Sequence, residues 1–104
     1  MKQFSLTILI AIIFASCDCN QDVRGIVLDK ETGKPVNNVT VYKKNKTWVT
    51  TRTDTAGYFE LSDISGGYGC PPMEVIVDDH NYKKVEVSIE AGSQKEIRLE
   101  KAKE

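Results

Sequence analysis

Few residues of this sequence could take part in chemistry, since three cysteines and a single histidine stand among 104 residues. His80 has no histidine partner, so neither a Ser/His/Asp relay nor a zinc site built on histidines can be assembled within one chain. Asp78, Asp79 and Asn81 surround it with oxygen ligands of the kind calcium uses. However, adjacent strand residues point to opposite faces, and the spacing of an EF-hand loop is absent. The sequence therefore predicts no catalytic residue, metal ligand or cofactor, and a protein that is not an enzyme.

The first sixteen residues differ in composition from the rest. An uncharged apolar run, FSLTILIAIIFA, extends from Phe4 to Ala15, with Lys2 before it and Ser16-Cys17 after it. A run of about a dozen residues is shorter than the roughly 20 that a helix needs to cross the hydrocarbon core of a bilayer. This arrangement predicts a signal peptide over residues 1–16 rather than a permanent transmembrane helix.

Residues 14–17 have the sequence Phe-Ala-Ser-Cys, which resembles the lipobox of bacterial lipoproteins. The resemblance implies that Cys17 receives a diacylglycerol thioether and anchors the chain in a membrane of the bacterial cell envelope. We expect the outer membrane, with the domain facing the periplasm or the cell surface. Asp18 and Asp22 are loosely similar to the acidic stretch of surface lipoproteins of the Bacteroidetes, although a solvated segment explains them more simply; the lipidated tether is expected over residues 17–21. The alternative is an ordinary secretory signal that leaves the Cys17 thiol free to form a disulfide.

The number of cysteines bears on this choice, because three is an odd count for an exported chain. If lipid occupies Cys17, Cys19 and Cys70 remain as a pair and predict a disulfide in an oxidising compartment. Such a bond closes a loop of about 50 residues, which corresponds to roughly 4 kcal/mol in a chain-entropy model. Two unpaired thiols are the alternative, since nothing in the sequence brings Cys19 and Cys70 together.

The rest of the sequence has the periodicity of β-structure. Val85, Val87 and Ile89 alternate with polar residues, and Ile97 and Leu99 do the same nearer the C-terminus. Such alternation predicts strands with one buried face, and stretches rich in β-branched and aromatic residues predict further strands upstream. The seven expected strands are 23–28, 39–42, 48–53, 58–61, 74–78, 84–89 and 96–100.

Turn-forming residues separate these stretches. Gly33 can adopt a positive φ, Asn45-Lys46 fits a tight hairpin, and the Asp54 carboxylate can accept hydrogen bonds from the backbone that follows it. Seven short strands at this spacing predict one all-β domain, a β-sandwich, over residues 22–100. Residues 101–104 are expected to be a frayed C-terminal tail.

Three groups of residues, in this order, resemble the carboxypeptidase regulatory-like domain, a transthyretin-like β-sandwich that is also related to Cna-B modules. The resemblance spans about residues 22–100, although Cys70-Pro71-Pro72 is not part of the general pattern. It implies a folding or spacer module, an adhesin stalk unit or a carbohydrate-binding-like domain, without catalytic machinery. The groups are Val23-x-Gly25-x-Val27-x-Asp29, Thr32-Gly33-x-Pro35-Val36-x-x-Val39-x-Val41 and Thr53-Asp54-x-x-Gly57-Tyr58-Phe59-x-Leu61.

Charge and aromatic residues limit the partners. With 14 basic and 15 acidic side chains, the chain lacks the basic surface that nucleic acid requires, so nucleic acid is excluded as a partner. Trp48 and Tyr68 are the predicted binding residues, because exposed aromatic side chains form binding hot spots. The alternative is that Trp48 and several tyrosines close the ends of the core with their polar tips in water.

These observations together predict a membrane-anchored, non-catalytic lipoprotein. Its β-sandwich is expected to act at the cell envelope as a protein-interaction or structural module. The alternative function is that of a carbohydrate-binding surface lipoprotein. In either case the expected partners are the membrane, through the lipid on Cys17, and an envelope protein or a glycan.

Overall fold

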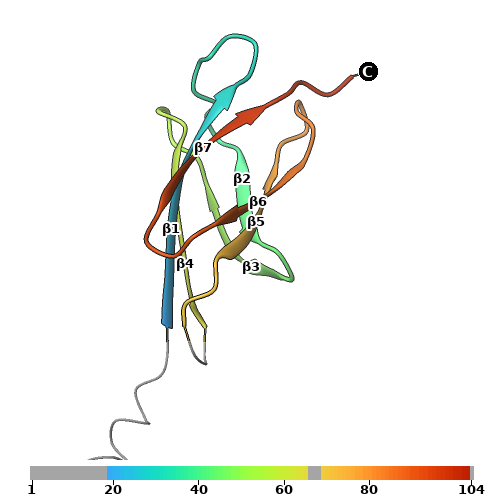
Figure 1. The fold of residues 1–104 in the computed structure, drawn as a ribbon. Helices are drawn as coiled ribbons and strands as arrows, with labels where there is room; N and C mark the ends of the chain where they lie inside the picture. The colour runs from blue at the N-terminus through green and yellow to red at the C-terminus, as the bar shows by residue number, and fades with distance from the viewer. Residues whose placement is uncertain (1–18, 66–68, 104) are drawn as a thin grey trace, which may run out of the picture.

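The computed structural model describes residues 19–65 and 69–103, which form strands, turns and loops (Figure 1). In this part of the chain no helix is long and apolar enough to cross a membrane. The predicted signal peptide, the lipidation residue Cys17 and the predicted binding residue Tyr68 lie outside the described residues. The seven strands are β1 (Cys19–Asp29), β2 (Thr40–Lys43), β3 (Lys46–Arg52), β4 (Tyr58–Ser65), β5 (Met73–Asp78), β6 (Val85–Ile89) and β7 (Gln94–Leu99).

The strands form two sheets, so the predicted all-β sandwich is confirmed. One sheet has three strands in the order β4-β1-β7, and the other has four in the order β3-β2-β5-β6. β1 is the central strand of the smaller sheet, antiparallel to β4 and parallel to β7. In Figure 1, β1 (blue) runs the length of the molecule with β4 and β7 on either side of it.

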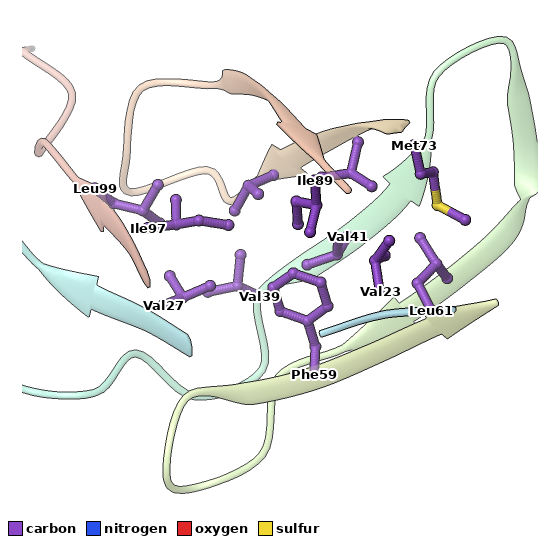
Figure 2. Close-up of a cluster of buried hydrophobic side chains, with 12 residues drawn as sticks. Val23, Val27, Val39, Val41, Phe59, Leu61, Met73, Ile89, Ile97 and Leu99 are labelled. Atoms are coloured by element: carbon purple, nitrogen blue, oxygen red, sulfur yellow. The ribbon is translucent and has the colours of Figure 1, made fainter. Parts of the chain in front are cut away.

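The core lies between the sheets and consists mainly of alternating strand residues, with Val39 from the segment before β2; β3 contributes only the partly buried Val49. Both sheets contribute buried side chains, which point toward one another (Figure 2). Val85 and Val87 of β6 are only partly buried, because β6 is an edge strand. The buried residues are Val23, Val27, Val39, Val41, Phe59, Leu61, Met73, Val75, Val77, Ile89, Ile97 and Leu99.

Turn residues act largely as expected from the sequence. Gly33 has a φ of 72°, and the Asp54 carboxylate accepts hydrogen bonds from the backbone N–H groups of Ala56 at 2.9 Å and Tyr58 at 3.0 Å. The β2–β3 hairpin turns one residue earlier than expected, at Lys44-Asn45, with Asn45 at a φ of 67°. Asparagine tolerates this left-handed conformation better than most residues, which explains the shift.

Both ends of the domain extend beyond the expected boundaries. β1 begins at Cys19, so residues 19–21 belong to a strand rather than to the tether predicted over residues 17–21; Cys19 pairs with Ser65 of β4. The expectation of a frayed tail is wrong for two residues, because Lys101 forms a β-bridge with Tyr82 and Ala102 donates its N–H to the carbonyl of Asn81 at 3.1 Å. In both places, pairing with a distant segment orders residues that have little local preference for structure.

Candidate functional site

A disulfide joins Cys19 to Cys70 at the end of the sandwich where β1 begins. The two Cα atoms are 5.5 Å apart, within the usual range for disulfides, and 51 positions separate them in sequence. The pairing predicted from the cysteine count is therefore confirmed. Because Cys19 starts β1 and Cys70 precedes β5, the bond ties the two sheets together. We call this end, defined by Cys19, Lys43, Lys46, Asp63 and Cys70, the N-terminal end of the sandwich.

A cluster of polar side chains closes the core at the N-terminal end. Gln21, 3% exposed, donates to the carbonyl of Pro71 at 2.8 Å and accepts from the Lys43 ammonium at 2.8 Å. Lys43 also donates to Asp63 Oδ2 at 2.7 Å, and Lys46 donates to the same oxygen at 3.1 Å. The bond from Lys43 is the main cause that holds the pKa of Asp63 well below its ordinary value of 3.8. Each group thus has a partner, as burial requires.

This cluster was not predicted from the sequence. The sequence does contain a local indication of it. Gln21 lies two residues before Val23, and Asp63 two residues after Leu61, so alternation places both polar side chains on the buried face. A polar residue at such a position needs a partner, which the sequence alone does not name. Lys43 supplies it from the opposite sheet.

Two large apolar side chains of the described residues are exposed. Trp48 of β3 is 74% exposed, and Ile64 of β4 is 62% exposed. The alternative that Trp48 closes the core is therefore wrong, whereas its predicted role in binding stays a prediction. Nothing in the sequence marked Ile64, because an isolated isoleucine in a strand is equally consistent with the core.

Tyr82 follows the alternative that assigns tyrosines to the ends of the core. Tyr82 packs against the core and donates to Asp29 Oδ2 at 2.8 Å, a bond that raises the pKa of Tyr82 to about 12. The same bond lowers the pKa of Asp29, which also accepts from the backbone N–H groups of Glu31 and Thr32. This arrangement closes the end opposite the disulfide.

The residues considered for metal binding lie at the end of β5 and in the turn that follows it. Asp79 accepts a hydrogen bond from the backbone N–H of Asn81 at 3.1 Å, and His80 is exposed in the same turn. Within residues 19–65 and 69–103, no three His, Cys, Asp or Glu side chains are grouped so that they could hold a metal ion.

A hollow of about 370 Å³ lies on the three-stranded sheet, next to the β6–β7 turn. In it the Ser62 hydroxyl donates to Asp22, and Arg24 lies opposite Glu60 in the β1–β4 register. A serine bonded to a carboxylate without an intervening base is not an activated nucleophile. The hollow therefore gives no reason to assign a reaction.

Comparison with known proteins identifies the family. The model of the CarboxypepD_reg-like domain matches residues 23–104, and the chain belongs to this family. Domains of this family are regulatory and non-catalytic. No curated protein matches the chain.

Solved structures agree with the fold. The chain is similar to 3-chlorocatechol 1,2-dioxygenase from Rhodococcus opacus 1CP, with a TM-score of 0.57 and 15% identity over 80% of this chain. It is also similar to a chain of a type II cohesin–X-dockerin complex from Acetivibrio cellulolyticus, with a TM-score of 0.51 and 24% identity over 75% of this chain. The matches span only 60% and 51% of those two chains. At these identities the likeness concerns the fold alone.

Proposed function

We propose that the chain is a lipid-anchored, non-catalytic module of the bacterial cell envelope, whose β-sandwich acts in protein interaction or as a structural element. The observation that carries the proposal is the spacing between Cys17 and the domain. A single residue, Asp18, separates the lipobox cysteine from Cys19, which opens β1 and is bonded to Cys70. This spacing suits a domain held directly at a membrane.

The proposed anchor on Cys17 accounts for stable attachment. Burial of acyl chains contributes about 0.8 kcal/mol per methylene, and more than one chain is needed for lasting membrane association. A diacylglyceryl group together with an amide-linked acyl chain meets that need. The same modification removes Cys17 from disulfide chemistry, which agrees with the Cys19–Cys70 bond.

The outer face of the four-stranded sheet supports a role in interaction. Tyr42 and Ile76 are half-buried and lie side by side in the β2–β5 register, pointing away from the core residues Val41 and Val77. On the same face, the charged residue Glu86 of β6 pairs with Ile76 and lies next to this apolar pair. An apolar centre with a polar rim is typical of protein interfaces.

Cell fractionation tests the anchor. The full chain, expressed in a Gram-negative host, is expected in the membrane fraction, and the Cys17→Ala variant in the soluble fraction. The Cys17→Ser variant serves as a near-isosteric control and is expected to behave like Cys17→Ala. Membrane association of both variants equal to that of the unsubstituted chain would contradict the proposal.

Carbohydrate binding is the second candidate, and the exposure of Trp48 favours it. An indole ring on the surface can stack on a sugar ring. Tyr58 and Tyr82 do not add to such a platform, because their hydroxyl groups are bonded to Glu60 and Asp29. Titration of the soluble Cys17→Ala chain with a glycan panel, followed by Trp48 fluorescence, tests this candidate; a response would favour it over the interaction module.

A further inference from the structure

Trp48 and Ile64 are exposed without a role in the core, and both lie near the N-terminal end of the sandwich. We propose that this end contacts the membrane surface, with the Trp48 and Ile64 side chains in the phospholipid head-group layer. The inference rests on the lipid anchor proposed above and adds an orientation to it. It makes the membrane a surface that the domain contacts directly.

The length of the tether sets the distance to the membrane. Two residue steps separate Cys17 from Cys19, and they span at most roughly 7 Å. The head-group layer on each side of a bilayer is itself roughly 5–8 Å thick. Because Cys19 is fixed by β-pairing and by its bond to Cys70, β1 cannot peel away to lengthen the tether. The N-terminal end is therefore held at the lipid surface.

Ile64 lies close to this point. It pairs with Asn20, the second residue of β1, and its side chain points outward because its neighbour Asp63 belongs to the inward cluster. The side chain is thus presented one register step from the tethered residue.

Trp48 approaches the same surface from the other sheet. β3 begins at Lys46, whose ammonium group binds Asp63, so the start of β3 is at the N-terminal end. The β2–β3 register moves from Tyr42–Thr50 to Lys43–Lys46, which leaves residues 47–49 without partners on β2. Val49 packs against the core, so the side chain of its neighbour Trp48 points to the outer face of the four-stranded sheet.

Trp48 and Ile64 lie on neighbouring strands. β3 and β4 are edge strands of different sheets and pack against each other. Because the short tether holds the N-terminal end of the sandwich at the lipid surface, both side chains would lie within reach of the lipid head groups. Tryptophan is enriched at membrane–water interfaces, where its ring lies at head-group level.

The chain supplies its own probe, since Trp48 is its single tryptophan. The lipidated full chain is reconstituted into phosphatidylcholine vesicles that contain brominated phosphatidylcholine, and Trp48 fluorescence is recorded. We expect the brominated lipid to quench most of the emission and the acrylamide quenching constant to fall several-fold relative to soluble Cys17→Ala. The matched control is the lipidated Trp48→Phe/Thr55→Trp variant, whose indole lies in the exposed β3–β4 turn at the opposite end and is expected to remain unquenched by the brominated lipid.

The outcomes separate the orientation from the anchor. A lipidated chain whose Trp48 is unquenched by brominated lipid and open to acrylamide would overturn the orientation while leaving the anchor intact. If Trp48 is shielded from acrylamide but not quenched by the lipid, a second protein copy or another protein covers it, which also overturns the orientation. Absence of lipid on Cys17 would overturn both.

Discussion

Asp63 is the residue on which the polar cluster of the N-terminal end depends. It receives hydrogen bonds from two ammonium groups, Lys43 and Lys46, and its pKa is held below the ordinary value of 3.8. A carboxyl whose pKa is lower in the folded than in the unfolded chain stabilises the folded state fully at a pH above its unfolded-state pKa. This stabilisation is lost as the pH falls from that value through the folded-state pKa. The cluster is thus expected to stabilise the domain at neutral pH and to lose this stabilising effect in acid.

The Asp63→Asn variant tests this expectation. At neutral pH it should lower the free energy of unfolding, because the largely buried Lys43 loses its counter-charge. The difference from the unsubstituted chain should narrow as the pH falls below 3.8. Urea unfolding of both chains from neutral pH to below pH 3.8 measures this difference in the free energy of unfolding. The control is Glu86→Gln, which removes the exposed ion pair with Lys44 and should lower the free energy of unfolding by at most about 1 kcal/mol. A difference that does not vary with pH would contradict the assignment.

Gly25 is required for the approach of Phe59 to β1. A Cβ atom at position 25 would lie 2.5 Å from Cζ of the Phe59 ring and 3.2 Å from the carbonyl oxygen of Lys95. Gly25→Ala should therefore destabilise the domain by roughly 1–3 kcal/mol through overpacking.

A double-variant cycle checks the cause. If the ring is the obstacle, Gly25→Ala combined with Phe59→Leu should cost less than the sum of the two single changes, as measured by urea unfolding. Additive costs would show that the strain comes from the backbone near Lys95 instead.

At the scale of elements, the Cys19–Cys70 bond joins the start of β1 to the segment before β5. Replacing both cysteines by alanine is expected to lower the free energy of unfolding by up to about 4 kcal/mol, because the unfolded chain gains conformational freedom. Denaturation without reductant measures this loss. As a control, reductant should lower the free energy of unfolding of the unsubstituted chain and leave that of the double variant unchanged. Equal stability of the two chains without reductant would contradict the role of the bond.

The strands themselves could be predicted from the sequence, whereas their arrangement could not. Alternation in stretches such as Val85 to Ile89 reports a buried face directly, which is why all seven strands were expected. The parallel pairing of β1 with β7 depends on contacts between residues more than sixty positions apart, such as Arg24 and Gln94. Local patterns carry no information about such a pairing.

For the whole molecule, sequence reasoning found parts of the candidate site according to how local their signals are. The cysteine count was enough to predict the Cys19–Cys70 bond. The cluster of Gln21, Lys43 and Asp63 was missed, because its members come from three strands of two sheets. The exposure of Trp48 depends on which face of β3 packs against the core, and the residues of this strand do not reveal that face by themselves.

The fold and the proposed anchor lead us to propose a module that contributes to function through its position at the membrane. The family is regulatory and non-catalytic, and the described hollow on the three-stranded sheet holds mutually paired polar groups. The half-buried Tyr42 and Ile76, on the two central strands of the four-stranded sheet, would then form a surface open to other envelope proteins. A photo-crosslinker at position 76, compared with one at position 98 on β7, would locate such a partner.

Lipidation of Cys17 is the point on which attachment and orientation both depend. Mass spectrometry of the full chain, extracted from the membranes of a bacterial host, measures it most directly. We expect a chain that begins at Cys17 and carries the added mass of a diacylglyceryl group and an amide-linked acyl chain on that residue. A chain that retains residues 1–16, or one cleaved elsewhere with Cys17 unmodified, would contradict the proposed anchor.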